Sequence, residues 1–409
     1  MRIPALGVAA FVGVAVMTGR SLPSVFLSRP AVDTVSSPAG PGSAEPNLAV
    51  ARDGRVYLSW LEPTPDSAFA FRLASFAGGA WSPPRTIRAG RDFFVNWADF
   101  PSVEVLGDGR LAAHWLQRTG KSTYAYAVRI ALSSDGGTTW GAPVSPHSDT
   151  SATEHGFVAL WPEGENLGAA WLDGRQYDKT NPKATNEMAV VSTTIGRSGT
   201  RGVESFLDRR ACDCCQVAAA VTSEGPVVVY RDRSAEEIRD ISVVRRLKGA
   251  WTEPAPLHRD NWHIAACPVN GPAIAASGRA VVVAWFTAAD DSARVKLAFS
   301  SDAGATFGAP IRIDEGAPAG RVDVALLKDG SALVTWVERI GGDTAAVRAR
   351  RVSAAGKAGA PVTIAASSSA RASGFPRMAL SGDDAWFAWT QPTRPSQVRV
   401  ARMPLSSLR

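Results

Sequence analysis

Short runs of apolar residues, separated by Gly-containing turns, recur along the chain from residue 45 to the C-terminus. Within them apolar and polar residues alternate, or the apolar run is continuous, and both patterns are typical of buried β-strands. No long stretch shows the 3.6-residue period of an amphipathic helix. The pattern therefore predicts an all-β protein.

These runs are organised as an internal repeat. The segment 45–60, EPNLAVARDGRVYLSW, returns six more times, and each copy ends in an aromatic residue 51 to 59 positions after the last one. Each copy reads as two strands around a turn, followed by a third strand. Most copies add a fourth strand with Pro near its start, which suits an edge strand. The closing aromatics are Trp60, Trp115, Trp171, Tyr230, Trp285, Trp336 and Trp389.

Four antiparallel strands repeated in this way predict a β-propeller, because radial repetition leaves only short, protected edges. We expect seven four-stranded blades within residues 45–409, with six blades as the alternative. The seventh copy stops after its third strand, whereas the segment 22–35 before the first copy has the character of a strand. We expect this segment to complete the last blade and close the ring, so that residues 21–44 supply a closing strand and a linker. A disordered leader is the alternative.

The first residues carry a targeting signal. One arginine is followed by an uncharged run from Ile3 to Met17, which is short for a membrane span and suits the apolar region of a signal peptide. An uncleaved anchor is the alternative. With residues 1–20 removed, we expect a periplasmic or secreted protein without an integral membrane span, in a compartment where disulfides persist.

Composition narrows the class of partner. The chain is 45% apolar and 20% charged, as in ordinary folded proteins, with a net charge of +6. No long basic run and no stripe of interleaved basic and aromatic residues is present, so we expect no nucleic-acid partner. We expect a monomer.

Two turns between third and fourth strands share a motif. SSDGGTTW (133–140) and SSDAGATF (300–307) fit the pattern Ser-x-Asp-x-Gly-x-Thr-aromatic, known as the Asp-box. With the repeats, this motif makes the chain resemble the sialidase superfamily of BNR-repeat propellers. The role of the motif is structural, because Asp135 and Asp302 can accept backbone N–H bonds within the turn.

The order of the strands indicates where to look for a site. The first-to-second and third-to-fourth turns lie on one face of a propeller. The second-to-third loops and the entries to the blades lie on the other face, here called the top face. Because the Asp-boxes fall on the bottom face, we expect the functional site on the top face.

Arginines recur in the top-face segments of several blades. Guanidinium groups directed at one axis would bind the carboxylate or phosphate of a small anionic ligand or glycan. The alternative is that they form salt bridges with Asp173, Asp232, Asp240 and Asp323 at the rim. The five arginines are Arg175, Arg231, Arg233, Arg321 and Arg377.

The resemblance to sialidases implies an arginine triad, a tyrosine nucleophile supported by a glutamate, and an aspartate acid/base. The match is partial, and Tyr177 is the tyrosine that falls in a top loop. Asp173, Tyr177 and Glu237 are the catalytic candidates. The expected function is binding of a small anionic or sugar-acid ligand, with exo-sialidase-like glycoside hydrolysis as its enzymatic form. A non-enzymatic metal-binding protein and a protein-interaction propeller are the alternatives.

Three of the four cysteines lie within RRACDCCQVAAA (209–220), at the entry to blade four, and the fourth enters blade five. Three interpretations stay open: disulfides that include a bridge between the blade entries, a thiolate site for copper or zinc completed by histidine, or a redox dithiol. If the segment is extended, alternation directs its first and second cysteines one way and its third the other. The candidate residues are Cys212, Cys214, Cys215, Cys267, His155 and His263.

Overall fold

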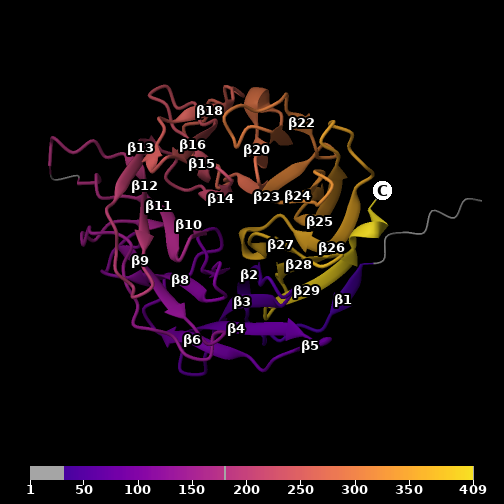
Figure 1. Cartoon of the computed structure of the whole chain (residues 1–409), viewed down its shortest axis with the longest axis horizontal. Helices are drawn as coiled ribbons and strands as arrows, with labels where there is room; N and C mark the ends of the chain where they lie inside the picture. Colours follow the sequence, from indigo (N-terminus) through magenta and orange to yellow (C-terminus); the bar gives the residue numbers. More distant parts are fainter. Residues whose placement is uncertain (1–31, 179–180, 409) are drawn as a thin grey trace, which may run out of the picture.

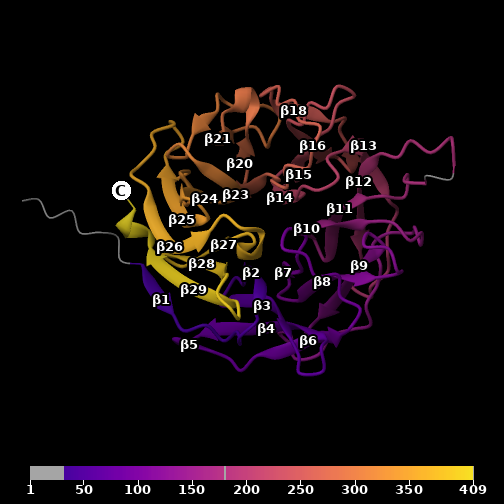
Figure 2. The same ribbon diagram turned by 180° about the vertical axis from the view of Figure 1, so that it is seen from behind.

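Seven antiparallel sheets are arranged as a ring in the computed structural model, which describes residues 32–178 and 181–408 (Figures 1 and 2). The predicted seven-bladed propeller is confirmed, and the alternative of six blades is wrong. Regular structure is almost entirely β in these residues, with three short 3₁₀ turns, Ala289–Asp291, Arg371–Ser373 and Leu405–Ser407. Within the described ranges, no helix has the length and apolarity needed to cross a bilayer.

The first strand of each blade faces the centre of the ring and the later strands lie progressively further out (Figure 1). Blade two has three named strands, with a bridge between Ile130 and Val144 at its outer edge.

Blade one contains β2 (Ala44–Val50), β3 (Val56–Pro63), β4 (Phe69–Ala77), β5 (Ala80–Trp81) and β6 (Arg85–Gly90), and blade two contains β7 (Ser102–Val105), β8 (Leu111–Arg118) and β9 (Tyr126–Ser133). Blade three contains β10 (His155–Glu163), β11 (Asn166–Asp173), β12 (Met188–Ile195) and β13 (Ser205–Ala211), and blade four contains β14 (Ala218–Thr222), β15 (Gly225–Arg231), β16 (Ile241–Leu247), β17 (Ala250–Trp251) and β18 (Ala255–His258). Blade five contains β19 (Ala273–Ser277), β20 (Ala280–Thr287), β21 (Arg294–Ser300) and β22 (Ile311–Arg312), and blade six contains β23 (Pro318–Leu326), β24 (Ala332–Gly341), β25 (Thr344–Val352) and β26 (Val362–Ser368). Blade seven contains β27 (Arg377–Ser381), β28 (Asp384–Gln391), β29 (Gln397–Pro404) and β1 (Asp33–Val35).

An N-terminal strand closes the ring, as expected. β1 pairs antiparallel with β29, with Thr34 opposite Ala401, and becomes the outermost strand of the last blade. The first and last parts of the chain therefore share one sheet (Figure 2). The expected signal peptide (1–20) and the first part of the expected closing segment (22–31) lie outside the described residues.

Among the described residues the core contains seven large clusters, each of which joins two neighbouring blades. A small eighth cluster within blade six consists of Ala319, Val337 and Ala345. Each of the seven large clusters contains the closing aromatic of a second strand, and all seven aromatics are buried. Trp60, for example, packs against Trp386 and Val398 of the last blade. The repeat of closing aromatics is thus the sequence pattern of the contacts between blades.

Several of these aromatics hydrogen bond to a residue two positions further along their own strand. The indole N–H of Trp60 donates to Glu62 at 2.8 Å, and that of Trp171 donates to Asp173 at 2.7 Å. Residues i and i+2 lie on one face of a strand, so the acceptor is placed by the period of the strand itself. This pairing satisfies a buried donor that would otherwise cost stability.

The Asp-boxes have the structural role expected of them. The carboxylate of Asp135 accepts the hydroxyl of Thr139 (2.6 Å) and the backbone N–H groups of Thr139 (2.9 Å) and Thr138 (3.0 Å). These bonds, the one from the Thr139 hydroxyl first, hold its pKa below the usual range. Asp302 accepts the N–H of Thr306 in the same way. In the first box Gly137 has a φ of 84°, a backbone conformation that favours glycine.

Ring closure yields a stability prediction. A chain that begins at residue 37, and so lacks β1, should lose about 2 kcal/mol of unfolding free energy, since each net hydrogen bond contributes roughly 1 kcal/mol. The matched control begins at residue 32 and retains β1. Thermal and denaturant unfolding of the two chains measure the difference, and equal stabilities would show that β1 does not hold the ring.

Candidate functional site

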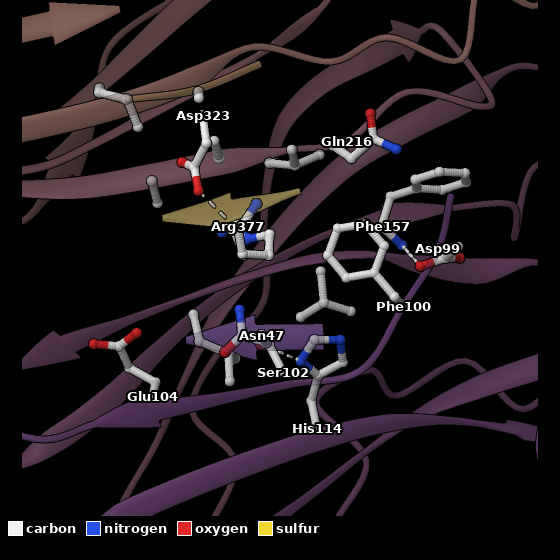
Figure 3. Close-up of a pocket in the computed structure, with 18 of the residues that line it drawn as sticks. Asn47, Asp99, Phe100, Ser102, Glu104, His114, Phe157, Gln216, Asp323 and Arg377 are labelled. Carbon is white, nitrogen blue, oxygen red and sulfur yellow. Dashed lines mark hydrogen bonds and ion pairs between the residues drawn. The ribbon is translucent and has the colours of Figure 1, made fainter. Parts of the chain in front are cut away.

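A pocket of about 190 Å³ lies in the central channel of the ring, and the first strand of every blade contributes to its wall (Figure 3). Strands β2, β7, β10, β14, β19, β23 and β27 all supply residues, so the propeller as a whole builds this site. We call it the channel pocket. The polar side chains on its wall that could act on a ligand are Asp99, Glu104, His114, Gln216, Asp323 and Arg377.

Arg377, at the start of β27, presents the channel pocket with a guanidinium that has a loose ion pair with Asp323, one of the rim salt bridges considered in the sequence, but unused hydrogen-bond donors. Its Nε lies 3.6 Å from Asp323 Oδ2, and within the described chain its guanidinium makes no hydrogen bond. Asp323 is itself committed to the backbone, because its carboxylate accepts the N–H groups of Val324 (2.9 Å) and Met378 (2.8 Å). Arg377 therefore has donors free for a ligand in the channel.

Two further titratable groups of the wall, Glu104 and His114, carry little charge at neutral pH. Burial raises the pKa of Glu104 to about 8, against the opposing effect of a backbone N–H and of Arg377. Burial also lowers the pKa of His114 to about 3, and its Nδ1 lies 2.9 Å from Ser102 Oγ. A mostly protonated Glu104 and a neutral His114 leave the loose ion pair of Arg377 and Asp323 as the charged feature of this part of the wall.

A second feature of the wall is a buried cluster of two carboxyl groups and a phenol. The Oη of Tyr126 donates to Glu154 Oε1 at 2.6 Å and lies 3.1 Å from Asp99 Oδ2. A phenol has one proton, so the second contact requires a proton on one of the carboxyl groups. Burial raises the pKa of Asp99 to about 7 and that of Glu154 to about 8, which supplies this proton at neutral pH.

This cluster leaves no room for a side chain at Gly156. A Cβ at that position would lie 2.0 Å from Asp99 Oδ2 and 2.8 Å from the ring of Tyr126. Asp99 Oδ1 also accepts the N–H of Phe157 at 2.7 Å. The entry to blade three is therefore fitted closely around the carboxyl group of Asp99, which faces the pocket (Figure 3).

Of the five arginines singled out in the sequence, Arg377 alone lines the channel pocket. Arg231 is fully buried, and its guanidinium donates to three backbone carbonyl groups at 2.6–2.9 Å. Arg321 is also buried, and it donates to backbone carbonyl groups and the Ser373 hydroxyl within segment 369–374. The donors of Arg231 and Arg321 are thus used to hold segments of neighbouring blades together.

Arg175 and Asp173 form the salt bridge that was the alternative to a site. Arg175 donates to both oxygens of Asp173, at 2.7 and 2.6 Å, and to Glu204 at 2.7 Å. Asp173 is completely buried and also accepts the indole N–H of Trp171. Burial opposes its ionisation, but the hydrogen bonds from Arg175 lower its pKa. Asp173 does not line the channel pocket.

Glu237 and Arg233 belong to an ion-pair network beside the cysteines. Glu237 accepts hydrogen bonds from Arg233 (2.7 Å) and Arg239 (2.9 Å), and the bond from Arg233 is the main reason that its pKa falls to about 2. Tyr177 is half-buried, and burial raises its pKa to about 12, with Asp213 among the charges nearby. The catalytic candidates chosen from the sequence thus divide between this network and the Asp173 salt bridge.

The four cysteines gather at one place, between the entries to blades four and five. Cys214 and Cys267 form a disulfide across 53 residues of sequence, with an S–S distance of 2.09 Å. Cys212 and Cys215 are buried free thiols whose sulfur atoms lie 2.9 Å apart. The segment turns at Asp213 and Cys214 instead of continuing as a strand, so the expected alternation of its cysteines is wrong.

Two arginines influence Cys212. Arg239 Nη1 lies 3.4 Å from its sulfur, and Arg231 adds a second positive charge. Burial opposes ionisation of Cys212, but the Cys215 thiol and these charges outweigh it and lower the pKa to about 7. Burial raises the pKa of Cys215.

The residues that could hold a metal fall into two overlapping groups within the described chain: Cys212, Cys214 and Cys215, and Asp213, Cys214 and Cys267. His155 and His263 belong to neither group. Because Cys214 is in a disulfide, a thiolate site for Cu(I) or Zn(II) fits only after that bond is reduced. Binding of copper or zinc stays a prediction for the reduced protein.

The two histidines lie in different surroundings. His155 is buried, with Nε2 at 3.0 Å from Asp149 Oδ2 and its ring stacked on that of His147 at 4.0 Å. His263 is exposed in the segment that leads to blade five. The ring of His155 is therefore occupied by its contacts with Asp149 and His147, whereas His263 faces solvent.

Comparison with known proteins gives similarity of fold. No family model and no curated protein sequence matches the chain. A solved structure of a protein of unknown function from Dyadobacter fermentans DSM 18053 is similar, with 13% identity, a TM-score of 0.51, and coverage of 92% of this chain and 98% of the other. Phage phi92 endosialidase is similar over 92% of this chain and 69% of its own, with 9% identity and a TM-score of 0.50.

Trypanosoma rangeli sialidase is also similar, with 13% identity, a TM-score of 0.49 and coverage of 90% of this chain and 60% of its own. The chain shares its fold with the Dyadobacter fermentans protein and the phage phi92 endosialidase. At these identities the likeness concerns the fold and not the activity.

The cluster of Asp99, Tyr126 and Glu154 was missed in the sequence. Both carboxyl groups stand in blade entries, WADFP and TEHGF, whereas Tyr126 reads as an ordinary residue of a third strand. An acidic residue at the entries of two consecutive blades was the available signal.

The carboxyl cluster predicts how stability depends on pH. Because Asp99 and Glu154 have raised pKa values, the folded protein binds more protons than the unfolded chain between about pH 4 and 8. The unfolding free energy should therefore fall as pH rises through this window. In Glu154→Gln, which keeps an acceptor for Tyr126, the fall should be smaller.

Thermal midpoints at pH 5 and pH 8 measure this difference. Glu165→Gln, at an exposed position, is the matched control and should follow the wild type. An unchanged pH dependence in Glu154→Gln would contradict the assignment of a raised pKa.

Proposed function

We propose that the protein binds a small sugar acid in the channel pocket, with Arg377 as the residue that binds the ligand carboxylate. The observation that carries this proposal is the guanidinium of Arg377, which makes no hydrogen bond within the described chain, on the wall of a pocket built by all seven blades. A guanidinium presents parallel N–H donors that match the two oxygens of a carboxylate.

The size and protonation of the pocket support a small ligand. Its volume of about 190 Å³ lies below the range of roughly 300–1,000 Å³ typical of larger ligand pockets, which favours a single sugar unit. The protonated Glu104 can donate a hydrogen bond to a hydroxyl or carboxylate oxygen without repelling an anion, and the raised pKa of Asp99 reduces the negative charge on the wall. Phage phi92 endosialidase shares the fold, and its name favours sugar acids as the class to test.

Glycoside hydrolysis is the second candidate, and Asp99 is the observation that favours it. A carboxyl group with a pKa of about 7 on the pocket wall can protonate a leaving-group oxygen at neutral pH. Tyr126 and Glu154 stand behind it and can return the proton. In this proposal Asp99 replaces Asp173 as the acid, because Asp99 lines the channel pocket and Asp173 does not.

The proposal places the protein in the periplasm or outside the cell. The Cys214–Cys267 disulfide supports this location, since such bonds persist in oxidising compartments. The monomeric state and a role as a protein-interaction propeller stay predictions.

Substitution of Arg377 tests ligand binding. Calorimetric titration with N-acetylneuraminate and glucuronate should show binding that falls 10- to 100-fold in Arg377→Gln, because a charge-assisted hydrogen bond contributes about 1.5–3 kcal/mol. Glucose, which lacks the carboxylate, should bind wild type and variant alike. The exposed Arg399 provides the control Arg399→Gln. Equal affinity of Arg377→Gln and wild type for both acids would refute the proposal.

Substitution of Asp99 tests hydrolysis separately. Wild-type protein should release the fluorophore from a sialoside between pH 5 and 8, and Asp99→Asn should be 10²- to 10⁴-fold slower while it still binds the sugar acid. Absence of release by the wild type would end the hydrolase candidate and leave the binding proposal to the titration.

A further inference from the structure

We propose that the four cysteines form a thiol–disulfide exchange relay, which moves one disulfide between the pair Cys214–Cys267 and the buried pair Cys212–Cys215. The two pairs are in contact, because the sulfur of Cys212 lies 3.7 Å from that of Cys214 and 2.9 Å from that of Cys215. One pair is oxidised and the other is reduced, which is the arrangement that exchange requires.

The first step is attack by Cys212. Its thiol loses a proton to solvent, and the thiolate attacks the sulfur of Cys214. A Cys212–Cys214 bond forms, the Cys214–Cys267 bond breaks, and the electron pair leaves on the sulfur of Cys267. Cys267 is exposed, so its thiolate takes a proton from water.

The second step is attack by Cys215 on the sulfur of Cys212. The Cys215 thiol loses its proton, a Cys212–Cys215 bond forms, and Cys214 leaves as a thiolate that takes up a proton. One disulfide and two thiols are present before and after both steps. The relay therefore needs no external oxidant or reductant.

The charges around the cluster favour this direction of attack. Arg239 and Arg231 stabilise a thiolate at Cys212. Asp213 lies 3.7 Å from the sulfur of Cys267, where its carboxylate favours the protonated thiol once that sulfur is released. A protonated Cys267 is a poor nucleophile, so the reverse attack is slowed, although the same carboxylate makes Cys267 a slower leaving group in the first step. The preference for the forward direction therefore rests on the thiolate of Cys212.

The relay decides whether two blade entries are covalently joined. In the structure the disulfide links the entry to blade four with the entry to blade five. Gln216, next to Cys215, lines the channel pocket and accepts the N–H of Gly271 at 2.8 Å. After exchange the entries are held by such non-covalent contacts alone, and Cys267 is an exposed thiol.

Disulfide mapping tests the relay, because trypsin places Cys267 and the other three cysteines on two separate peptides. Cleavage after arginine yields peptides 211–231, with three cysteines, and 260–279, with Cys267. Native, unreduced protein is incubated with iodoacetamide and digested, and the peptides are followed by mass spectrometry. The structure places the peptides in one cross-linked species at the start.

In the wild type, the cross-linked species should convert over time into separate peptides, with carbamidomethyl groups on Cys214 and Cys267 and a disulfide between Cys212 and Cys215. In Cys215→Ser the relay should stop half-way, with Cys267 alone labelled. In Cys212→Ser the cross-link should persist, and labelling of Cys267 should slow at least 10-fold. Because Cys212 is buried, Cys212→Ala is a second variant, and thermal unfolding verifies that both fold.

Three results would overturn the relay. In the first, Cys267 is labelled no faster in the wild type than in Cys212→Ser and Cys212→Ala. In the second, the wild type holds both disulfides and no thiol. In the third, metal analysis finds stoichiometric copper or zinc on the cysteines. None of these results involves Arg377 or the sugar acid.

Discussion

Burial of one large aromatic side chain between each pair of neighbouring blades is the constraint on which this ring depends. Seven core clusters each join two blades, and each contains a closing aromatic. A single blade cannot bury this surface alone, so the blades are stable only beside one another. β1 matters for the same reason, because it completes the sheet of the last blade, which packs against the first blade.

The same constraint explains why acidic residues after the second strands misled the search for a site. A buried indole N–H needs an acceptor, and the period of a strand places position i+2 beside it. Asp173 meets this need for Trp171, and Glu62 meets it for Trp60. An acidic residue two positions after a closing aromatic is therefore part of the fold in these blades, even where it resembles a catalytic group at the top face.

The fold could be predicted from the sequence because the repeat and its turns are local patterns that occur seven times. The missing fourth strand of the last copy stands out against the other copies. The site was harder to predict, because long-range contacts decide which candidate residues face the channel and which are buried elsewhere. Arg231 and Arg377 are alike as letters, but one is enclosed by backbone carbonyl groups of other blades and the other faces the channel. Burial also raises the pKa values of Asp99 and Glu154, and no spacing in the sequence reports burial of a carboxyl group.

The side chain of Gln216 links the channel pocket to the segment that carries the cysteines. Gln216 follows Cys215 directly, donates to the carbonyl oxygen of Ala98 at 2.7 Å and accepts the N–H of Gly271. Ala98 precedes Asp99, so the amide of Gln216 connects the entries of blades two, four and five at the wall of the pocket. The turn that brings Cys212 and Cys215 together also sets the position of Gln216, because the two features are adjacent in the chain. A change of disulfide partner at Cys214 would therefore act within two residues of a side chain that holds the segment carrying the carboxyl group of Asp99.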